Sequence, residues 1–409
     1  MGSPQAERLF AEGVALHKQG RLAEAAATYA RACEADPSHV AAQFNLAVAL
    51  HADGRHQDAE RAYRRAIALK PDLVQALNNL ANLLLAHDRV AEALDALMRA
   101  TAIAPGFAPP WNNLGNALLK MGRTPEAAAR FARALEVDPD FLEARENLGR
   151  TLLSLGRGAE ALPHLEGALA ARPGDDVLRF SRDVAAGGRP SRPPDAFVTE
   201  LFDEMAAKFD EHLVDRLGYR IPGRVADVLG DWLDARARPR RALDLGCGTG
   251  LVADALRGRF ESMHGVDLSP RMVEMALARR LYEAVEAGEL TAFLGARADA
   301  SADLVVAADV FVYVGDLAPV FGQCARVLAP GGRLAFSVEG GAPGEGYRLE
   351  ATSRYSHSDP YVRSLAAAHG LAVVHSSAET IRSERGVPAG GRLYVLERGV
   401  SPASARDSA

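Results

Sequence analysis

Residues 241–250 read RALDLGCGTG, and this stretch decides the fold of the second half of the chain. The run before the first glycine is short and apolar, as in a buried strand, and a helix is predicted from about Leu251. Gly246, Gly248 and Gly250 let the chain turn sharply and let a ligand approach the backbone at the positive end of that helix. The order of strand, glycine loop and helix predicts a ligand site in an α/β domain.

Downstream of the glycine loop, predicted strands alternate with predicted helices. This alternation indicates a mostly parallel sheet with helices on both faces. Residues 371–377 (LAVVHSS) and 391–398 (GRLYVLER) are interpreted as the final strands, joined by a loop through Arg382 and Pro388. The tail, residues 400–409, is small and polar, and we expect it to be disordered.

A glycine loop of this kind also occurs in dinucleotide-binding enzymes, so two acidic residues are needed to separate the alternatives. Asp244 precedes the loop by two residues. An acid there would repel a pyrophosphate but suits a sulfonium ligand that carries an ammonium group. Asp267 ends the next predicted strand, in MHGVDLSP, where a carboxylate can accept hydrogen bonds from both hydroxyls of a ribose. The alternative for Asp267 is a helix cap for the segment after Ser269.

The pattern D-x-G-x-G-x-G at residues 244–250 resembles motif I of class I S-adenosylmethionine-dependent methyltransferases. LAPGGRLAFSVE, residues 328–339, is similar to the turn into the fifth strand of that family. The resemblance implies a Rossmann-like α/β domain over residues 241–399 that uses S-adenosylmethionine and no metal. It also implies a set of cofactor-binding residues: Asp244, Gly246, Cys247, Gly248, Gly250, Asp267, Leu268, Met272, Glu289 and Asp309, with Tyr219 and Arg220.

Two further parts of the site follow from this resemblance. The family's acidic residue after the third strand, which would reach the adenine amino group, is not obvious here, and Glu289 is the candidate. The methyl acceptor should lie beside side chains that follow the predicted strand Asp303–Ala307, because ligands bind beyond the carboxyl ends of parallel strands. These side chains are Asp309, Tyr313 and Asp316.

A general base is needed only for some acceptors, since an amine that is bound neutral asks for none. For an oxygen or acid acceptor, His357 in RYSHS is the candidate because it titrates near neutrality. The alternative is that Ser356 and Ser358 cap the next helix and His357 is a loop residue. Arg354 and Tyr355 could bind a carboxylate of the substrate or cofactor.

Residues 197–240 return to helical spacing and are predicted to form a helical lid, or pre-motif segment. Tyr219 and Arg220 lie where this fold commonly covers the cofactor, so we expect them near its methionine end. The alternative is a packing helix with Phe209 and Leu213 in a core.

The first part of the chain repeats every 34 residues. In each copy the apolar residues recur at three and four positions, which predicts two amphipathic helices that must stack with their neighbours into a solenoid. The period resembles that of tetratricopeptide repeats. We predict five repeats and a closing helix over residues 1–186, then a flexible linker at residues 187–196, which begins with GGRPSRPPD (residues 187–195). Each copy ends in a proline: Pro37, Pro71, Pro105, Pro139 and Pro173.

One repeat position carries asparagine in four copies: Asn45, Asn79, Asn113 and Asn147. An amide offers a donor and an acceptor, which matches a peptide backbone. The sequences NNLA and NNLG resemble the repeats of O-linked N-acetylglucosamine transferase. In that enzyme a row of asparagines at one repeat position, an asparagine ladder, binds extended peptide. The alternative is that the asparagines tie neighbouring repeats together.

Composition limits the remaining classes of function. The 409 residues have a formal net charge of −6, which gives no overall basic field for nucleic acid. Three scattered cysteines predict neither a disulfide framework nor a zinc site and suggest a reducing compartment. We found no secretion signal and no apolar run long enough for a membrane span, so we expect a cytoplasmic protein.

The resemblance extends over nearly the whole chain. Residues 209–222, 308–317 and 354–358 are similar to a bacterial group described as predicted methyltransferases with tetratricopeptide repeats. We therefore expect a methyltransferase whose repeats bind a peptide or protein as substrate or partner on their concave face. The alternatives are a small-molecule O- or N-methyltransferase whose repeats recruit a partner, and a scaffold that senses the cofactor without catalysis.

Overall fold

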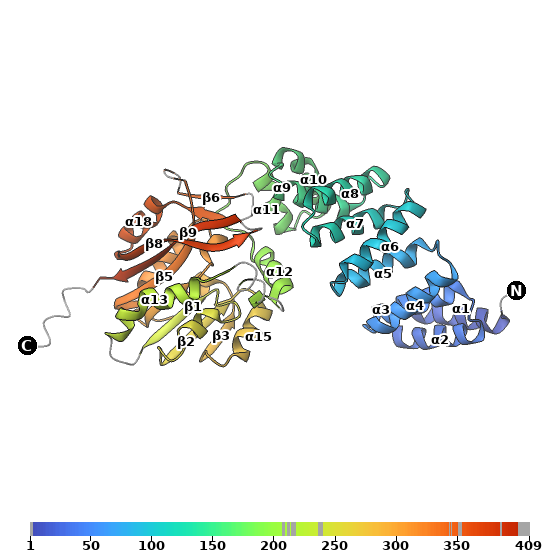
Figure 1. Cartoon of the computed structure of the whole chain (residues 1–409), viewed down its shortest axis with the longest axis horizontal. Helices are drawn as coiled ribbons and strands as arrows, with labels where there is room; N and C mark the ends of the chain where they lie inside the picture. The colour runs from blue at the N-terminus through green and yellow to red at the C-terminus, as the bar shows by residue number, and fades with distance from the viewer. Residues whose placement is uncertain are drawn as a thin grey trace, which may run out of the picture. The chain divides into compact units, whose positions relative to one another are not determined.

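The computed structural model describes residues 3–206, 209–210, 213, 218–235, 240–342, 344, 346–350, 354–384 and 387–399 (Figure 1). The chain divides into two compact units, Met1–Gly174 and Asp175–Ala409. None of the described helices is long and apolar enough to cross a membrane. The tail predicted to be disordered, residues 400–409, lies outside the described residues.

The first unit is built of paired helices, as predicted. Successive helices pack against each other along the chain. Their bounds are α1 (Pro4–Lys18), α2 (Leu22–Ala35), α3 (Val40–Ala52), α4 (His56–Leu69), α5 (Val74–Ala86), α6 (Val90–Ile103), α7 (Ala108–Lys120), α8 (Thr124–Val137), α9 (Leu142–Ser154) and α10 (Gly158–Ala171).

Two repeated features explain the pairing of these helices. Small residues stand where the helices of a pair cross: at Gly115, an added Cβ would lie 2.5 Å from the Phe131 ring. The turn between the helices needs a left-handed residue. Glycine supplies it in four repeats, with φ between +72° and +77°, and Asp88 supplies it in the remaining one with φ +56°. The repeat period therefore reflects one backbone geometry used five times.

The asparagine ladder is paired within the unit. The side-chain amide of Asn113 donates to Oδ1 of Asn78 in the preceding repeat, at 2.8 Å. In the next repeat Asn147 donates to Oδ1 of Asn112, at 2.9 Å. Asn45 instead donates to the carbonyl oxygen of Ala41 in its own helix. At Asn113 and Asn147 these bonds favour the alternative in which the asparagines tie neighbouring repeats together.

The second unit contains a sheet in the strand order β3-β2-β1-β4-β5-β7-β6, with β9 antiparallel to β5 and β8 antiparallel to β9. From β3 to β5 all neighbours are parallel. The strands are β1 (Arg241–Leu245), β2 (Ser262–Asp267), β3 (Ala284–Ala287), β4 (Ala302–Ala307), β5 (Leu328–Gly340), β6 (Tyr347–Leu349), β7 (Tyr355–His357), β8 (Leu371–Glu384) and β9 (Val387–Arg398). The Rossmann-like α/β architecture predicted for this part of the chain is confirmed.

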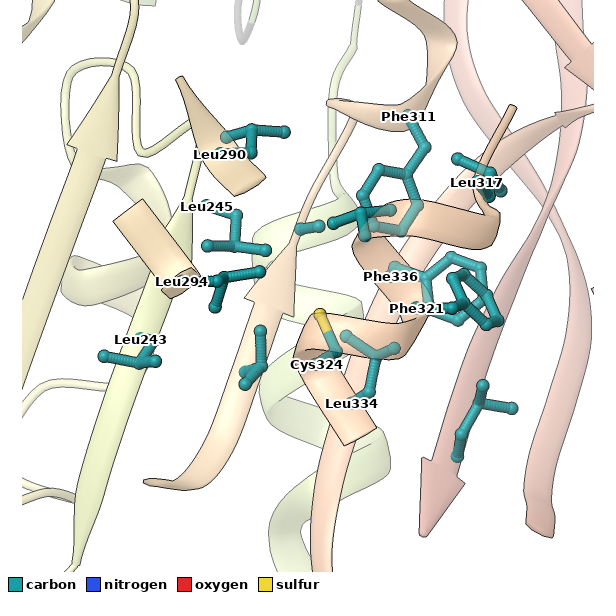
Figure 2. Close-up of a cluster of buried hydrophobic side chains, with 14 of the residues drawn as sticks. Leu243, Leu245, Leu290, Leu294, Phe311, Leu317, Phe321, Cys324, Leu334 and Phe336 are labelled. Atoms are coloured by element: carbon teal, nitrogen blue, oxygen red, sulfur yellow. The ribbon is translucent and has the colours of Figure 1, made fainter. Parts of the chain in front are cut away.

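Helices cover both faces of the sheet. The helices of the second unit are α11 (Asp176–Ala185), α12 (Asp195–Met205), α13 (Ile221–Asp234), α14 (Leu251–Ala255), α15 (Pro270–Ala278), α16 (Leu290–Gly295), α17 (Ala318–Val327) and α18 (Asp359–Ala368). Strand β4 is buried on both faces: Val305 belongs to the core under α16 and α17, and Leu304 and Val306 to the core under α13. Figure 2 shows Phe311, Phe321 and Phe336 gathered in the first of these cores.

Two sequence predictions differ from the structure. Arg382 and Pro388 lie within β8 and β9, not in a loop, because the final hairpin extends far past the predicted strand ends. Part of the predicted flexible linker is bonded to the second unit: the carbonyl of Ser191 accepts the N–H groups of Gly315 and Asp316, at 2.8 and 3.0 Å. The neighbouring prolines prevent a helix here, which leaves backbone carbonyls available as acceptors.

The paired asparagines lead to a prediction about repeat stability. Replacing Asn113 with alanine leaves the buried Oδ1 of Asn78 without its donor, which should cost about 1 to 3 kcal/mol of local stability. Hydrogen exchange of the backbone amides of α5 and α7 should be faster by the factor that corresponds to this loss of local stability.

The control is Asn82→Ala, at an exposed position on α5, which should leave exchange nearly unchanged. If Asn113→Ala exchanges like the wild-type chain, the asparagines do not tie the repeats together.

Candidate functional site

A cavity of about 600 Å³ lies in the second unit, beyond the carboxyl ends of β1, β2 and β4. The strand order reverses between β1 and β4, and such a switch point is where open α/β sheets bind ligands. Besides the loops after these strands, α12 and residues 191–193 contribute to the wall. All the residues that line it belong to the second unit.

The glycine loop after β1 has the left-handed geometry that its sequence predicts. Gly246, Gly248 and Gly250 have φ of +60°, +52° and +94°. A Cβ on Gly246 would lie 2.6 Å from a methyl group of Val310, so a side chain there would clash with the loop after β4. The loop can therefore present backbone to a ligand only because these residues are glycines.

Asp267, at the end of β2, holds the glycine loop in place. Its Oδ2 accepts the N–H of Gly248 at 2.8 Å, and its Oδ1 accepts the N–H of Ser269 at 2.9 Å. Burial raises the pKa of Asp267, and the two backbone N–H groups oppose that rise. The carboxylate lines the cavity, and each oxygen retains acceptor capacity for a ligand hydroxyl. The cap of α15 is Ser269, whose Oγ accepts the N–H of Met272, so Asp267 is not that cap.

Asp244 lies beneath the glycine loop and is not part of the cavity wall. It is 1% exposed, and Oδ2 accepts a hydrogen bond of 2.7 Å from the hydroxyl of Tyr282. Oδ1 is buried without a hydrogen-bond partner among the described residues. Burial raises the pKa of Asp244 to about 7, against the opposing effect of the Tyr282 bond. The carboxyl group can therefore change its charge near neutral pH.

The predicted adenine-binding residue, Glu289, is on the cavity wall together with Leu268. It caps α16 by accepting the N–H of Ala292 at 2.9 Å, and Nη1 of Arg192 lies 3.1 Å from its Oε1. Burial alone would raise the pKa of Glu289, but its hydrogen bonds and Arg192 lower it overall. Cys247 is also on the wall, whereas Met272 is fully buried away from it.

Aromatic side chains also line the cavity. The ring of Phe202 on α12 makes edge contacts with Phe209 and Tyr313, with centroids 6.0 and 5.3 Å apart. Nε of Arg354 donates to the hydroxyl of Tyr313 at 3.3 Å. Tyr219 is also on the wall.

Asp309 and Asp316 also line the cavity. Arg220, predicted beside Tyr219, is instead exposed at the start of α13 and does not line the cavity.

The structure does not bring His357 or Tyr355 to the cavity. RYSHS forms β7 between β5 and β6, which buries both side chains. Nε2 of His357 lies 2.9 and 3.0 Å from the carbonyl oxygens of Val314 and Gly315, which can only accept, so this nitrogen carries a proton. Burial lowers the pKa of His357 to about 4. The hydroxyl of Tyr355 donates to the carbonyl of Pro190.

Sequence reasoning missed Arg382, Phe202 and Arg192, which all line the cavity. Arg382 had no usable signal, because its neighbours in ETIRSER, residues 379–385, are mostly polar. Arg192 and Phe202 had none, because they reach the site from the segments around α12. Among the described residues, no group of three or more His, Cys, Asp or Glu side chains could hold a metal ion.

Comparisons with known proteins agree with both units. A methyltransferase domain model matches residues 243–336, and tetratricopeptide repeat models match residues 10–74, 50–117 and 112–176. Ubiquinone biosynthesis O-methyltransferase of Paracidovorax citrulli is 34% identical over 117 residues, which are 26% of this chain and 48% of that protein. The same enzyme of Thiobacillus denitrificans is 34% identical over 114 residues, with the same coverage.

The chain spans about half the length of the curated relatives it matches. A solved S-adenosylmethionine-dependent methyltransferase of Methanosarcina mazei is 17% identical and covers 41% of this chain and 96% of its own, with a TM-score of 0.35. The repeat models and the methyltransferase model fall in the first and second units with their expected folds. The chain thus contains tetratricopeptide repeats over residues 10–176 and a methyltransferase domain over residues 243–336.

Proposed function

We propose that this protein transfers a methyl group from S-adenosylmethionine to an acceptor bound in the cavity of the second unit. The observation that carries the proposal is the Asp267 carboxylate, which holds the glycine loop and still faces the cavity. A ribose would lie against Asp267 and the adenine near Glu289 and Leu268. The methionine end would lie over the glycine loop, with Asp244 beneath it.

When bound, the cofactor supplies a methyl group attached to a positively charged sulfur, and an acceptor can attack the carbon of this methyl group directly. The protein's task is then mainly to position the acceptor in line with that methyl group and to exclude water. Phe202, Phe209 and Tyr313 provide an apolar wall for the acceptor end. Asp309 and Arg354 supply the polar groups that can orient it.

For the repeats we propose a role in binding a peptide or protein, as substrate or as partner. A solenoid of paired helices presents a continuous surface suited to such a ligand. The asparagines are less available than the sequence suggested, because Asn113 and Asn147 already donate to neighbouring repeats. Asn45 and Asn79 remain proposed contacts.

A second candidate is a small-molecule O-methyltransferase whose repeats recruit a partner. The matched relatives are named as ubiquinone biosynthesis O-methyltransferases, and the aromatic-walled cavity would suit a small apolar acceptor. Arg354 beside Tyr313 could orient a carboxylate of such an acceptor.

The cofactor site gives the first test. Asp267→Ala should weaken binding of S-adenosylhomocysteine by about 2 to 4 kcal/mol, because two charge-assisted hydrogen bonds to the ribose are lost. Isothermal titration calorimetry measures this change. Asp254→Ala removes the same charge from the exposed side of α14 and should bind like the wild-type protein. Unchanged affinity in Asp267→Ala would mean that the ribose lies elsewhere.

The acceptor class gives the second test. The protein is incubated with methyl-labelled S-adenosylmethionine and host-cell extract, and the label is then separated into macromolecular and small-molecule fractions, with Asp267→Ala as the control. Label in the macromolecular fraction supports a peptide or protein substrate, and label in the small-molecule fraction supports the second candidate. If neither fraction exceeds the control, methyl transfer is contradicted.

A further inference from the structure

A buried arginine joins two carboxylates at the acceptor end of the cavity. Arg382 is 2% exposed, and its Nη1 lies 3.0 Å from Oδ1 and 3.1 Å from Oδ2 of Asp309. Its Nη2 donates to Oε1 of Glu339 on β5. We call Asp309, Arg382 and Glu339 the ion triad. Burying such charges lowers the stability of the fold. Buried charges at a cavity wall therefore mark a candidate functional site.

Two features of the sheet place the side chains of Arg382 and Glu339. Arg382 follows a register shift in the β8–β9 pairing, between Thr380 and Arg382, and such irregularities redirect a side chain. Glu339 lies opposite Gly391, where a Cβ would come within 2.3 Å of a backbone oxygen and force the strands apart. The triad therefore depends on a bulge and on a close strand approach.

Asp309 is itself held in an unusual backbone conformation. Its φ is +58°, a left-handed value that costs a non-glycine residue free energy, and its N–H donates to Oγ of Ser337 at 2.8 Å. Asp309 and Arg382 both line the cavity, whereas Glu339 does not. The carboxylate of Asp309 is thus fixed from behind and open to a ligand in front.

We propose that Arg382 and Glu339 position the Asp309 carboxylate as the proton acceptor of the reaction, and that the methyl acceptor is a hydroxyl compound. This inference rests on the methyl transfer proposed above. A neutral hydroxyl can donate its hydrogen to Asp309 and keep an oxygen lone pair for attack. An amine bound neutral already has a free lone pair and needs no base, so a carboxylate held in place as a base favours a hydroxyl acceptor.

The step balances as follows. The hydroxyl oxygen forms a bond to the methyl carbon, the bond between that carbon and sulfur breaks, and its electron pair stays on sulfur. The hydroxyl proton passes to Asp309, which later releases it to water. The products are a methyl ether, S-adenosylhomocysteine and one proton.

The charges around Asp309 suit this role. Burial raises the pKa of Asp309 to about 6, Arg382 and Arg354 act to lower it, and Glu339 acts to raise it. Burial raises the pKa of Tyr219 and of Tyr313, and the negative charge of Asp309 raises both further. A carboxyl group with this pKa is ionised at neutral pH yet is a better base than an exposed aspartate.

The first test measures the pKa of Asp309 in the full-length protein by carbon NMR of labelled aspartate, with the resonance assigned by its loss in Asp309→Asn. Arg382→Gln removes a positive charge and should raise the pKa. Glu339→Gln removes a negative charge and should lower it. A pKa of Asp309 near the ordinary aspartate value in the wild-type protein and in both variants would overturn the inference.

Arg382→Gln leaves buried carboxylates unpaired and can fail to fold, which heat unfolding would reveal. Glu339→Gln is nearly isosteric and then carries the test alone. A pKa of Asp309 that stays the same or rises in Glu339→Gln would contradict the triad.

The second test identifies the acceptor atom. The labelling experiment is repeated with a ¹³C-methyl cofactor, and the carbon shift of the transferred methyl group shows whether it is attached to oxygen, nitrogen or sulfur. Attachment to an ether oxygen supports the inference, and attachment to nitrogen or sulfur overturns it while leaving methyl transfer intact. Failure of the proposed function itself looks different: S-adenosylhomocysteine does not bind and no label is transferred.

Discussion

The second unit depends on a single carboxylate, that of Asp267, which accepts backbone N–H groups from two segments. One is Gly248, in the loop after β1, and the other is Ser269, which caps α15. These bonds fix the loop against the end of β2, and the left-handed glycines make that geometry attainable. The floor of the cavity follows from this arrangement.

The walls of the cavity come from segments that lie farther apart in the sequence than those that form its floor. Residues 191–193 reach it because the Ser191 carbonyl is anchored by the backbone of Gly315 and Asp316. Arg382 reaches it because β8 and β9 form a long hairpin that packs on β5 through β9. Low solvent exposure strengthens the electrostatic coupling among Asp309, Arg382 and Glu339. His357 is also buried, but its side chain does not line the cavity, so it cannot act there as a base.

The parts that the sequence predicted well are those encoded by local spacing. The repeat period, the strand before the glycine loop and the acid at the end of β2 each occupy one short segment, so the helical pairs and the parallel sheet could be inferred. The failures involve contacts between distant segments. His357 was predicted to be accessible because it lies in a short polar segment, but β7 pairs with β5 and buries its side chain. Arg382 became important only through residues 73 and 43 positions away in the chain.

The asparagines of the repeats show the same limit. Their spacing predicted a ladder, but spacing cannot show whether an amide faces a ligand or the amide of a neighbouring repeat, as Asn113 does with Asn78.

In the second unit, the cavity floored by Asp267 and the glycine loop is proposed to bind S-adenosylmethionine and not a dinucleotide. Calorimetric titration of the full chain with S-adenosylhomocysteine, and separately with NADH, tests it most directly. The account predicts saturable binding of S-adenosylhomocysteine at one site and no heat with NADH, whereas binding of NADH, or no binding of S-adenosylhomocysteine, would contradict it.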